Sequence, residues 1–330
     1  MLEPLDADIR LKSRLVDIPR RTVLRLNARL GRYDNEVIWL IGDARSGTTW
    51  VSDLINHDKH YRDMFEPIRP SRVDPTSFLT PQQYVRPGDS YPQLTELMSE
   101  IFSGRFTHPR VDTANRRPLY GGLLVKDCFA NLFARWASVE FPDVRPVLLI
   151  RNPFAVALSK KKKPRWYWPT DPADLVAQDA LMEDHLEPYR DVLSRTAAEG
   201  DDIQCMIATW AVINLVPLRQ FGPDDVHVCF YEEIYDEPER RLRELYEFTD
   251  RSGKRSNFSL DRETIERPSR MASEHSTIVT NTSPLTTWKN ELTTDQIDRG
   301  LALLAEFGVD DLYGDGVTPD RRVLDRLRFG

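Results

Sequence analysis

The stretch at residues 37–55, VIWLIGDARSGTTWVSDLI, limits the folds open to this chain more than any other part of it. An apolar run leads into a short loop bounded by Gly42 and Gly47, and a helical pattern follows. A strand that is almost entirely apolar is typical of a parallel sheet covered on both faces. The N–H groups of such a loop, together with the first turn of the following helix, attract an anion. The stretch therefore predicts an α/β fold with an anion site where its first strand ends.

The composition of the loop indicates which anion it suits. Gly42 and Gly47 have the spacing of the nucleotide loop G-x-x-x-x-G-K-[ST], but Thr48 stands at the lysine position. That lysine reaches the β- and γ-phosphates in nucleotide-hydrolysing proteins, so its absence weakens a Mg²⁺–nucleotide interpretation. Arg45 instead places a cation inside the loop, and hydroxyl donors come from Ser46, Thr48 and Thr49. The loop favours a single phosphate-centred anhydride.

Strand and helix patterns alternate along the rest of the chain. Further strands are expected at 123–125, 144–150 and 226–231, and helices at 48–57, 92–103, 129–140, 153–162, 173–197, 202–220, 238–249 and 293–307. This alternation predicts an α/β fold of the P-loop type, with a mostly parallel sheet and helices on both faces in a single domain. We expect a helical arm at 1–34 and the domain at 35–330, with 67–120 inserted over one end of the sheet.

Composition narrows the classes of partner. The net charge of -7 gives no reason to expect nucleic-acid binding. Cys128, Cys205 and Cys229 share no short spacing, which argues against disulfides and CxxC metal sites and favours a reducing compartment. His57 and His60 have no further ligands nearby in sequence, so no metal site is expected. No window approaches the ~18 uncharged apolar residues of a membrane span, and we expect a cytoplasmic protein. The oligomeric state is not indicated.

The N-terminal arm allows two interpretations. Apolar residues recur at helical spacing among many arginines over residues 7–32, and Pro19 is a candidate break: Leu11, Leu15, Ile18, Leu26 and Leu30. Either this helix packs on the domain, or it contacts a membrane surface or a partner protein.

The residues RSGTTW, from Arg45 to Trp50, resemble the [RK]-S-G-T-T-W loop of sulfotransferases that use 3′-phosphoadenosine 5′-phosphosulfate (PAPS). The resemblance implies that the loop holds the 5′-phosphosulfate through Arg45, Ser46, Gly47, Thr48 and Thr49. Arg45 would also offset the charge that grows on the leaving phosphate oxygen. Trp50 would lie near the adenine, although a core tryptophan is the alternative.

A second anion site is expected after the strand at 144–150. Arg151 ends that strand and Ser159 lies two helical turns further on, so a guanidinium and a hydroxyl can clamp a phosphate monoester. With Pro153 they match R-x-P-x(5)-S, which implies the 3′-phosphate site of the same family. Tyr231 resembles the family's tyrosine near the adenine, and WKNELTTDQ at 288–296 its C-terminal motif. The family's R-K-G loop is replaced here by Asn281-Thr282-Ser283.

Sulfuryl transfer also needs a base for the acceptor hydroxyl and a cation for the transferring group, and the sequence offers candidates for both. Glu66 lies in MFEPIRP, which resembles the F-E-P of carbohydrate-type sulfotransferases, and we expect it to act as base with a raised pKa. Lys126 ends a predicted strand and either stabilises the sulfuryl oxygens or pairs with a nearby acid. The cytosolic phenol and steroid branch has K-[ST]-H there, whereas Asp127, a second base candidate, and Cys128 follow Lys126 here.

The basic and aromatic stretch SKKKKPRWYWP at 159–169 is either a solvated helix end with an aromatic cap or a surface for sugar rings and anions.

Overall, we expect sulfuryl transfer from PAPS, leaving PAP, to a hydroxyl of a carbohydrate, glycolipid or other hydroxylated metabolite, without a metal. The rival hypotheses are a small-molecule kinase using ATP–Mg²⁺ and a non-catalytic PAP-binding protein.

Overall fold

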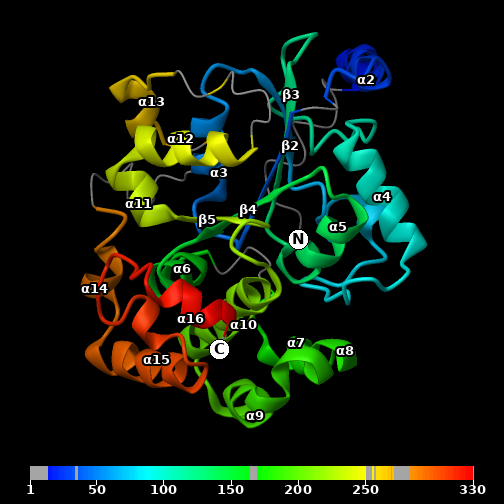
Figure 1. Ribbon diagram of the computed structural model, residues 1–330. Coiled ribbons are helices and arrows are strands. Elements are labelled where there is room, and N and C mark those ends of the chain that lie inside the picture. The colour runs from blue at the N-terminus through cyan, green and yellow to red at the C-terminus, as the bar shows by residue number, and fades with distance from the viewer. Residues whose placement is uncertain are drawn as a thin grey trace.

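A five-stranded sheet forms the centre of the molecule (Figure 1). The computed structural model describes residues 14–33, 36–163, 169–249, 255, 258–268, 270 and 283–329. The strands are β1 Val37–Gly42, β2 Tyr61–Phe65, β3 Gly122–Asp127, β4 Pro146–Ile150 and β5 His227–Phe230. They pair in the order β2-β3-β1-β4-β5 and every pairing is parallel, which confirms the predicted α/β class.

Side chains alternate across this sheet between two cores, as a two-residue period requires. In β1, Ile38 and Leu40 join one apolar core, whereas Trp39 and Ile41 join the other. Apolar residues on both faces explain why β1 reads as one uninterrupted hydrophobic run. The first core is covered by α3 Thr48–Ile55, α11 Tyr231–Asp236, α12 Pro238–Thr249 and α13 Arg262–Glu266.

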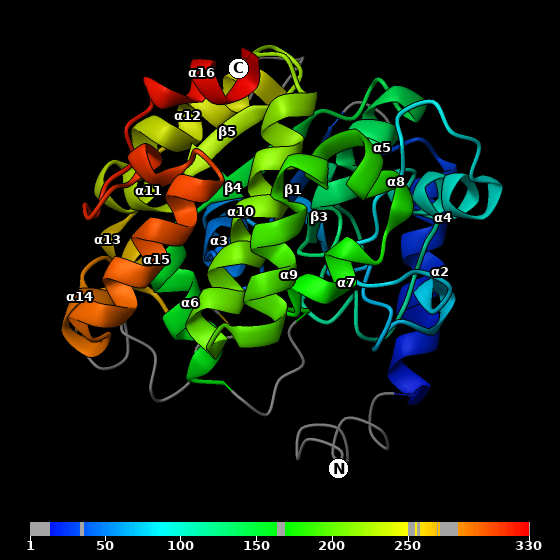
Figure 2. The same cartoon turned by 90° about the horizontal axis from the view of Figure 1, so that it is seen from below.

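The larger core lies under the remaining helices, with α10 crossing the middle of this face (Figure 2). These helices are α2 Arg14–Arg29, α4 Pro92–Phe102, α5 Ala134–Glu140, α6 Pro153–Lys161, α7 Pro172–Val176, α8 Asp179–Leu181, α9 Arg190–Glu199, α10 Asp202–Gln220, α14 Thr287–Glu291, α15 Thr294–Glu306 and α16 Val323–Phe329. Single turns occupy Asp74–Thr76, Asn131–Phe133, Met182–Leu186, Glu187–Tyr189 and Asp310–Leu312. No described helix has the length and apolar character needed to cross a membrane.

The edge strand β2 was not expected, because charged residues interrupt its apolar pattern. Arg62 is fully buried and pairs with Asp112 at 2.9 Å, and it donates to the carbonyl of Phe106 at 2.7 Å. Both partners belong to the expected insertion at 67–120. A charged residue in this edge strand therefore anchors the insertion, and this role is invisible in a hydrophobicity pattern.

The single helix predicted at 173–197 is wrong. The chain instead forms α7 and α8, then the turns Met182–Leu186 and Glu187–Tyr189, and only then α9. Pro188 explains part of the interruption, because proline cannot donate the backbone hydrogen bond that a continuous helix requires. By contrast, α2 continues through Pro19 without a break.

Candidate active site

The loop between β1 and α3 depends on both of its glycines. A Cβ on Gly42 would lie 2.6 Å from the carbonyl oxygen of Leu149 on the neighbouring strand. Gly47 has a φ of 92°, and a Cβ there would overlap the ring of Tyr231. Arg45 also takes a positive φ, 73°, which a non-glycine residue adopts only when its surroundings hold it there. The loop is thus fixed in a conformation with the start of α3 directly behind it.

The two expected anion sites meet at Arg45. Its Nε donates to Oγ of Ser159 on α6 at 3.0 Å. Its carbonyl oxygen accepts from Nη1 of Arg151, at the end of β4, at 3.2 Å. The structure therefore brings Arg45, Arg151 and Ser159 together, as parallel strands ending at one edge of a sheet require.

Arg151 is held in place on several sides. Its Nη2 donates to the carbonyl of Pro284 at 2.8 Å, and its guanidinium lies 4.2 Å from the centre of the Tyr231 ring. The Nε1 of Trp210 donates to its carbonyl oxygen at 2.9 Å. Its Nε is buried and has no hydrogen-bond partner within the described parts of the chain. The Nε–H of this guanidinium is thus left for a ligand or a water.

Positive charges gather around the loop. Burial and the neighbouring charge of Arg151 lower the pKa of Arg45. Burial and the charge of Arg45 likewise lower the pKa of Lys163, at the end of the lysine run. Oγ of Ser46 is buried without a partner among the described residues. Like charges held together in this way are stabilised by a bound anion, and phosphate is the anion that such a loop suits.

The aromatic residues beside the loop form a cluster. Trp50 is only 4% exposed, lies 5.3 Å from Tyr231 and 6.2 Å from Tyr235 between ring centres, and donates from Nε1 to the carbonyl of Ile265 at 3.2 Å. Tyr231 is buried between this cluster and Arg151. In this state Trp50 is a packed core side chain that supports Tyr231.

Glu66 and Lys126 form the second part of the site, at the ends of β2 and β3. Nζ of Lys126 donates to Oε1 of Glu66 at 2.6 Å, and the thiol of Cys128 donates to the same oxygen at 3.1 Å. Nη1 of Arg69 donates to Oε2 at 2.6 Å. Glu66 has a φ of 48°, a further non-glycine residue in the left-handed region. Such strain is typical of functional positions held by their surroundings.

The expectation of a raised pKa for Glu66 is wrong. Burial alone would raise it, but the cations of Lys126 and Arg69 outweigh burial and lower the pKa of Glu66 to about 2. Burial would also lower the pKa of Lys126, yet its contacts with Cys128 and Glu66 raise it. At neutral pH the two residues form an ion pair, and Glu66 is a carboxylate.

Asp127, the second base candidate, has a different environment. Its Oδ2 accepts from the backbone N–H of Ile68 at 2.7 Å, and its Oδ1 accepts from Phe129 at 3.0 Å. Burial raises the pKa of Asp127 to about 7. Because both oxygens bind backbone and the side chain is fully buried, Asp127 connects the segment after Glu66 to the end of β3.

Several residues near the site were missed in the sequence. Arg69 and Arg270 are the clearest: Arg270 pairs with Asp63 at 2.7 Å, and its guanidinium lies 4.9 Å from the centre of the Phe65 ring. Nζ of Lys126 lies 4.2 Å from the same ring. The sequence does carry a signal for Arg69, because it lies only three residues after Glu66 and could be expected to pair with it. Nothing local indicates Arg270, because its partner Asp63 lies far away in the sequence, in β2.

Some expected features fall outside the described residues. These are the aromatic part of the basic stretch, at 164–168, and Asn281 and Thr282 of the loop that replaces R-K-G. Within the described part of the lysine run, Lys160 is only 1% exposed, so the solvated interpretation is wrong for this residue.

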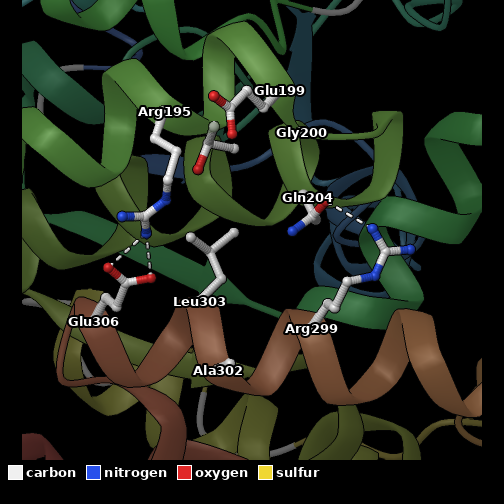
Figure 3. Close-up of a pocket in the computed structure, with 9 residues that line it drawn as sticks. Arg195, Glu199, Gly200, Gln204, Arg299, Ala302, Leu303 and Glu306 are labelled. Atoms are coloured by element: carbon white, nitrogen blue, oxygen red, sulfur yellow. Dashed lines mark hydrogen bonds and ion pairs between the residues drawn. The ribbon is translucent and has the colours of Figure 1, made fainter.

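A separate cleft of about 240 Å³ lies between α9, α10 and α15 (Figure 3). Its arginines are already paired: Arg195 contacts Glu306 at 2.6 Å, and Arg299 contacts Gln204 at 3.0 Å and Asp201 at 2.9 Å. It shares no residue with the loop or with the Glu66 cluster.

The chain belongs to the sulfotransferase domain family, whose model matches residues 35–301. This match covers most of the chain, including the loop, Glu66, Lys126, Arg151 and Tyr231, and it makes the protein a transferase of the sulfotransferase class. No curated protein sequence matches significantly.

Three solved structures are similar at low identity. A sulfotransferase from Alicyclobacillus acidocaldarius is 17% identical over 88% of this chain and 98% of its own, with a TM-score of 0.43. The sulfotransferase domain from the curacin biosynthetic pathway is 15% identical over 82% and 97%, with a TM-score of 0.40. A mouse sulfotransferase complexed with PAP is 13% identical over 92% of both chains, with a TM-score of 0.41.

Proposed function

We propose that this protein transfers a sulfuryl group from PAPS to a hydroxyl group of a carbohydrate, glycolipid or other hydroxylated metabolite. The observation that carries the choice of donor is the junction of Arg45, Arg151 and Ser159. Two segments that we propose as anion sites, more than a hundred residues apart in sequence, meet within hydrogen-bond distance. A donor with a 5′-phosphosulfate and a 3′-phosphate on one nucleoside accounts for both segments, whereas a nucleoside triphosphate accounts for only one.

In this proposal the loop binds the phosphosulfate through its backbone, Arg45, Ser46, Thr48 and Thr49. Arg151 and Ser159 bind the 3′-phosphate, and Tyr231 and Trp50 support the nucleoside side. Arg45 stabilises the phosphate oxygen on which negative charge grows as its bond to sulfur breaks. No step in this account needs a metal ion.

Glu66 takes the proton of the acceptor hydroxyl as the new sulfur–oxygen bond forms. At rest Lys126 and Arg69 make Glu66 a weak base. When Lys126 turns to the oxygens of the transferring group, Glu66 loses its strongest partner and becomes a better base. The ion pair would thus link donor binding to proton removal. Cys128 in place of the histidine of the phenol and steroid branch, and Glu66 before Pro67, favour an aliphatic hydroxyl.

Ligand titration tests the proposal against its rivals. PAP should bind the purified protein without Mg²⁺, and labelled PAPS should transfer label to an acceptor in a fractionated extract of the host. Binding of ATP–Mg²⁺ without a response to PAP would support the kinase and overturn the proposal. Binding of PAP without transfer to any fraction would support the non-catalytic alternative.

We also propose that α2 contacts an anionic membrane surface. Val23, Leu26 and Leu30 are 36%, 53% and 63% exposed on one stripe of the helix and the residue after it. Arg25 and Arg29 are exposed on the same helix, and Arg32 is exposed in the turn that follows it. Figures 1 and 2 both place α2 at the margin of the molecule. Leucines beside arginines suit lipid headgroups, whereas a second copy would bring like charges together. Membrane contact of this kind would suit a membrane-bound acceptor such as a glycolipid.

A further inference from the structure

Asp43 and Lys160 form an ion pair inside the protein, next to the proposed donor site. Nζ of Lys160 lies 2.8 Å from Oδ1 and 2.7 Å from Oδ2 of Asp43. The two side chains are 1% and 2% exposed. Taking two charges out of water is costly, so a buried pair needs an explanation beyond stability alone.

The position of the pair supplies one. Asp43 is the first residue of the loop after Gly42, and its carbonyl oxygen accepts from the backbone N–H of Ser46 at 3.1 Å. Lys160 directly follows Ser159 on α6. The pair therefore ties the start of the phosphosulfate loop to the helix that carries a 3′-phosphate residue.

A second tie runs parallel to the first. Arg45 and Ser159 are hydrogen-bonded two residues further along the loop and one residue earlier on the helix. The Arg45–Ser159 bond uses a guanidinium and a hydroxyl that would also bind the phosphates of a ligand. The Asp43–Lys160 pair is buried and uses none of them, so it can hold loop and helix in register while a ligand is bound.

We propose that the Asp43–Lys160 pair is a positioning device that fixes the distance between the 5′-phosphosulfate site and the 3′-phosphate site. Without the pair, the 5′-phosphosulfate site and the 3′-phosphate site each keep their own binding groups. The distance between the two sites, however, is no longer fixed. A nucleotide with both phosphates gains from this preorganisation, whereas a nucleotide with one phosphate does not. The pair thereby selects for bisphosphorylated nucleotides. This inference rests on the proposed function.

The test replaces the pair with apolar side chains. Each single variant, Asp43→Leu or Lys160→Met, leaves one buried charge unpaired and should lower the Tm by roughly 5–15 °C. The double variant removes both charges and should recover most of that loss, since apolar replacement of a buried pair is often neutral. Binding to the double variant is then measured by calorimetry with PAP, adenosine 5′-monophosphate and adenosine 3′-monophosphate.

The expected result is that the double variant binds PAP about tenfold or more weakly than wild type, while its affinity for each monophosphate changes less than about threefold. Unchanged PAP affinity would overturn the inference, and so would an equal loss for all three ligands, which indicates general loop support. If the double variant does not fold, Asp43→Asn with Lys160→Gln keeps a neutral hydrogen bond and is judged by the same ratios.

A matched control removes an ion pair elsewhere. Arg195→Met with Glu306→Leu breaks an exposed pair at the cleft of Figure 3 and should leave the ratio of PAP to monophosphate affinity unchanged. A wild-type protein that does not bind PAP would instead overturn the proposed function and this inference together. Wild-type binding with an unaltered double variant would overturn the inference alone.

Discussion

Arg45 and Ser159, 114 residues apart in the sequence, are joined by a hydrogen bond of 3.0 Å. The bond connects the loop after β1 with the helix after β4, which are neighbouring strands of the sheet. It therefore merges two separate sequence motifs into one surface, and Glu66, the proposed base, lies close enough to Arg45 for their charges to interact.

Replacing Arg151 with alanine should weaken PAP binding by about 10–100-fold, because hydrogen bonds to charged groups contribute about 1.5–3 kcal/mol. Isothermal titration calorimetry measures the loss. Arg151→Lys should restore only part of the affinity, since lysine cannot reach the carbonyls of Arg45 and Pro284 at once. An Arg151→Ala variant that binds PAP as wild type does would remove this residue from the site.

Gly47→Ala should destabilise the protein and weaken PAP binding together. The new Cβ would overlap the Tyr231 ring, and the φ of 92° is itself unfavourable for alanine. Gly88→Ala is the matched control, because Gly88 has a φ of 88° but nothing lies within 4 Å of the added Cβ. We expect both variants to lose about 1 kcal/mol from backbone strain, and Gly47→Ala at least about 1 kcal/mol more. Equal losses in urea unfolding would contradict the close packing against Tyr231.

Glu66→Gln should lower kcat by about 10²–10⁴-fold while PAP affinity stays near wild type, as expected for the loss of a general base. The side chain keeps its size, and its amide oxygen can still accept from Lys126 and Cys128 although the contact with Arg69 is lost, so the fold should persist with lower stability. The measurement is turnover of labelled PAPS with an acceptor found in the extract. Full turnover in this variant would exclude Glu66 as the base. Asp127→Asn, which alters a backbone-binding carboxyl, should instead change mainly the Tm.

The acid stability of the protein should depend on Glu66. Its pKa lies near 2 in the folded state, below its ordinary value of 4.5, so the carboxylate stabilises the fold. This contribution is fully present above pH 4.5 and is lost as the pH falls from about 4.5 towards 2, by at most about 3 kcal/mol. Unfolding free energies of wild type and Glu66→Gln should therefore converge over that range. Curves that stay parallel down to pH 2.5 would contradict the ion pair with Lys126.

Leu26→Glu with Leu30→Glu should abolish sedimentation with vesicles that contain anionic lipid. Both side chains are more than half exposed, so the fold should tolerate the change. Wild type should bind anionic vesicles and release them at high salt, because arginine–lipid attraction is screened. Val139→Glu, at a site that is 46% exposed, is the control. The membrane proposal would be excluded if the wild-type protein did not sediment with anionic vesicles. It would also be excluded if the wild-type protein formed dimers that the double variant does not form.

Much of the site could be predicted because its signals are local. Gly42 and Gly47 lie at the two ends of a loop between an apolar run and a helical pattern, which is typical of a strand–loop–helix unit. Likewise, Arg151 directly follows the apolar run that forms β4. These features lie on neighbouring parallel strands, so their convergence follows from the topology. Edge strand β2 was missed because Arg62 and Asp63 break its apolar pattern. The pKa of Glu66 was predicted in the wrong direction because only the fold brings Lys126 and Arg69 into contact with its carboxylate.

The sequence by itself determined the α/β class, the loop and the types of residue that carry charge. Only the tertiary structure decided which charges meet. In the sequence Lys160 is one of four consecutive lysines, yet it is buried against Asp43, while burial and the nearby charge of Arg45 lower the pKa of Lys163. The reason is physical: an ionic contact depends on distance and burial, and both are set by how helices and loops pack, not by neighbours in the chain.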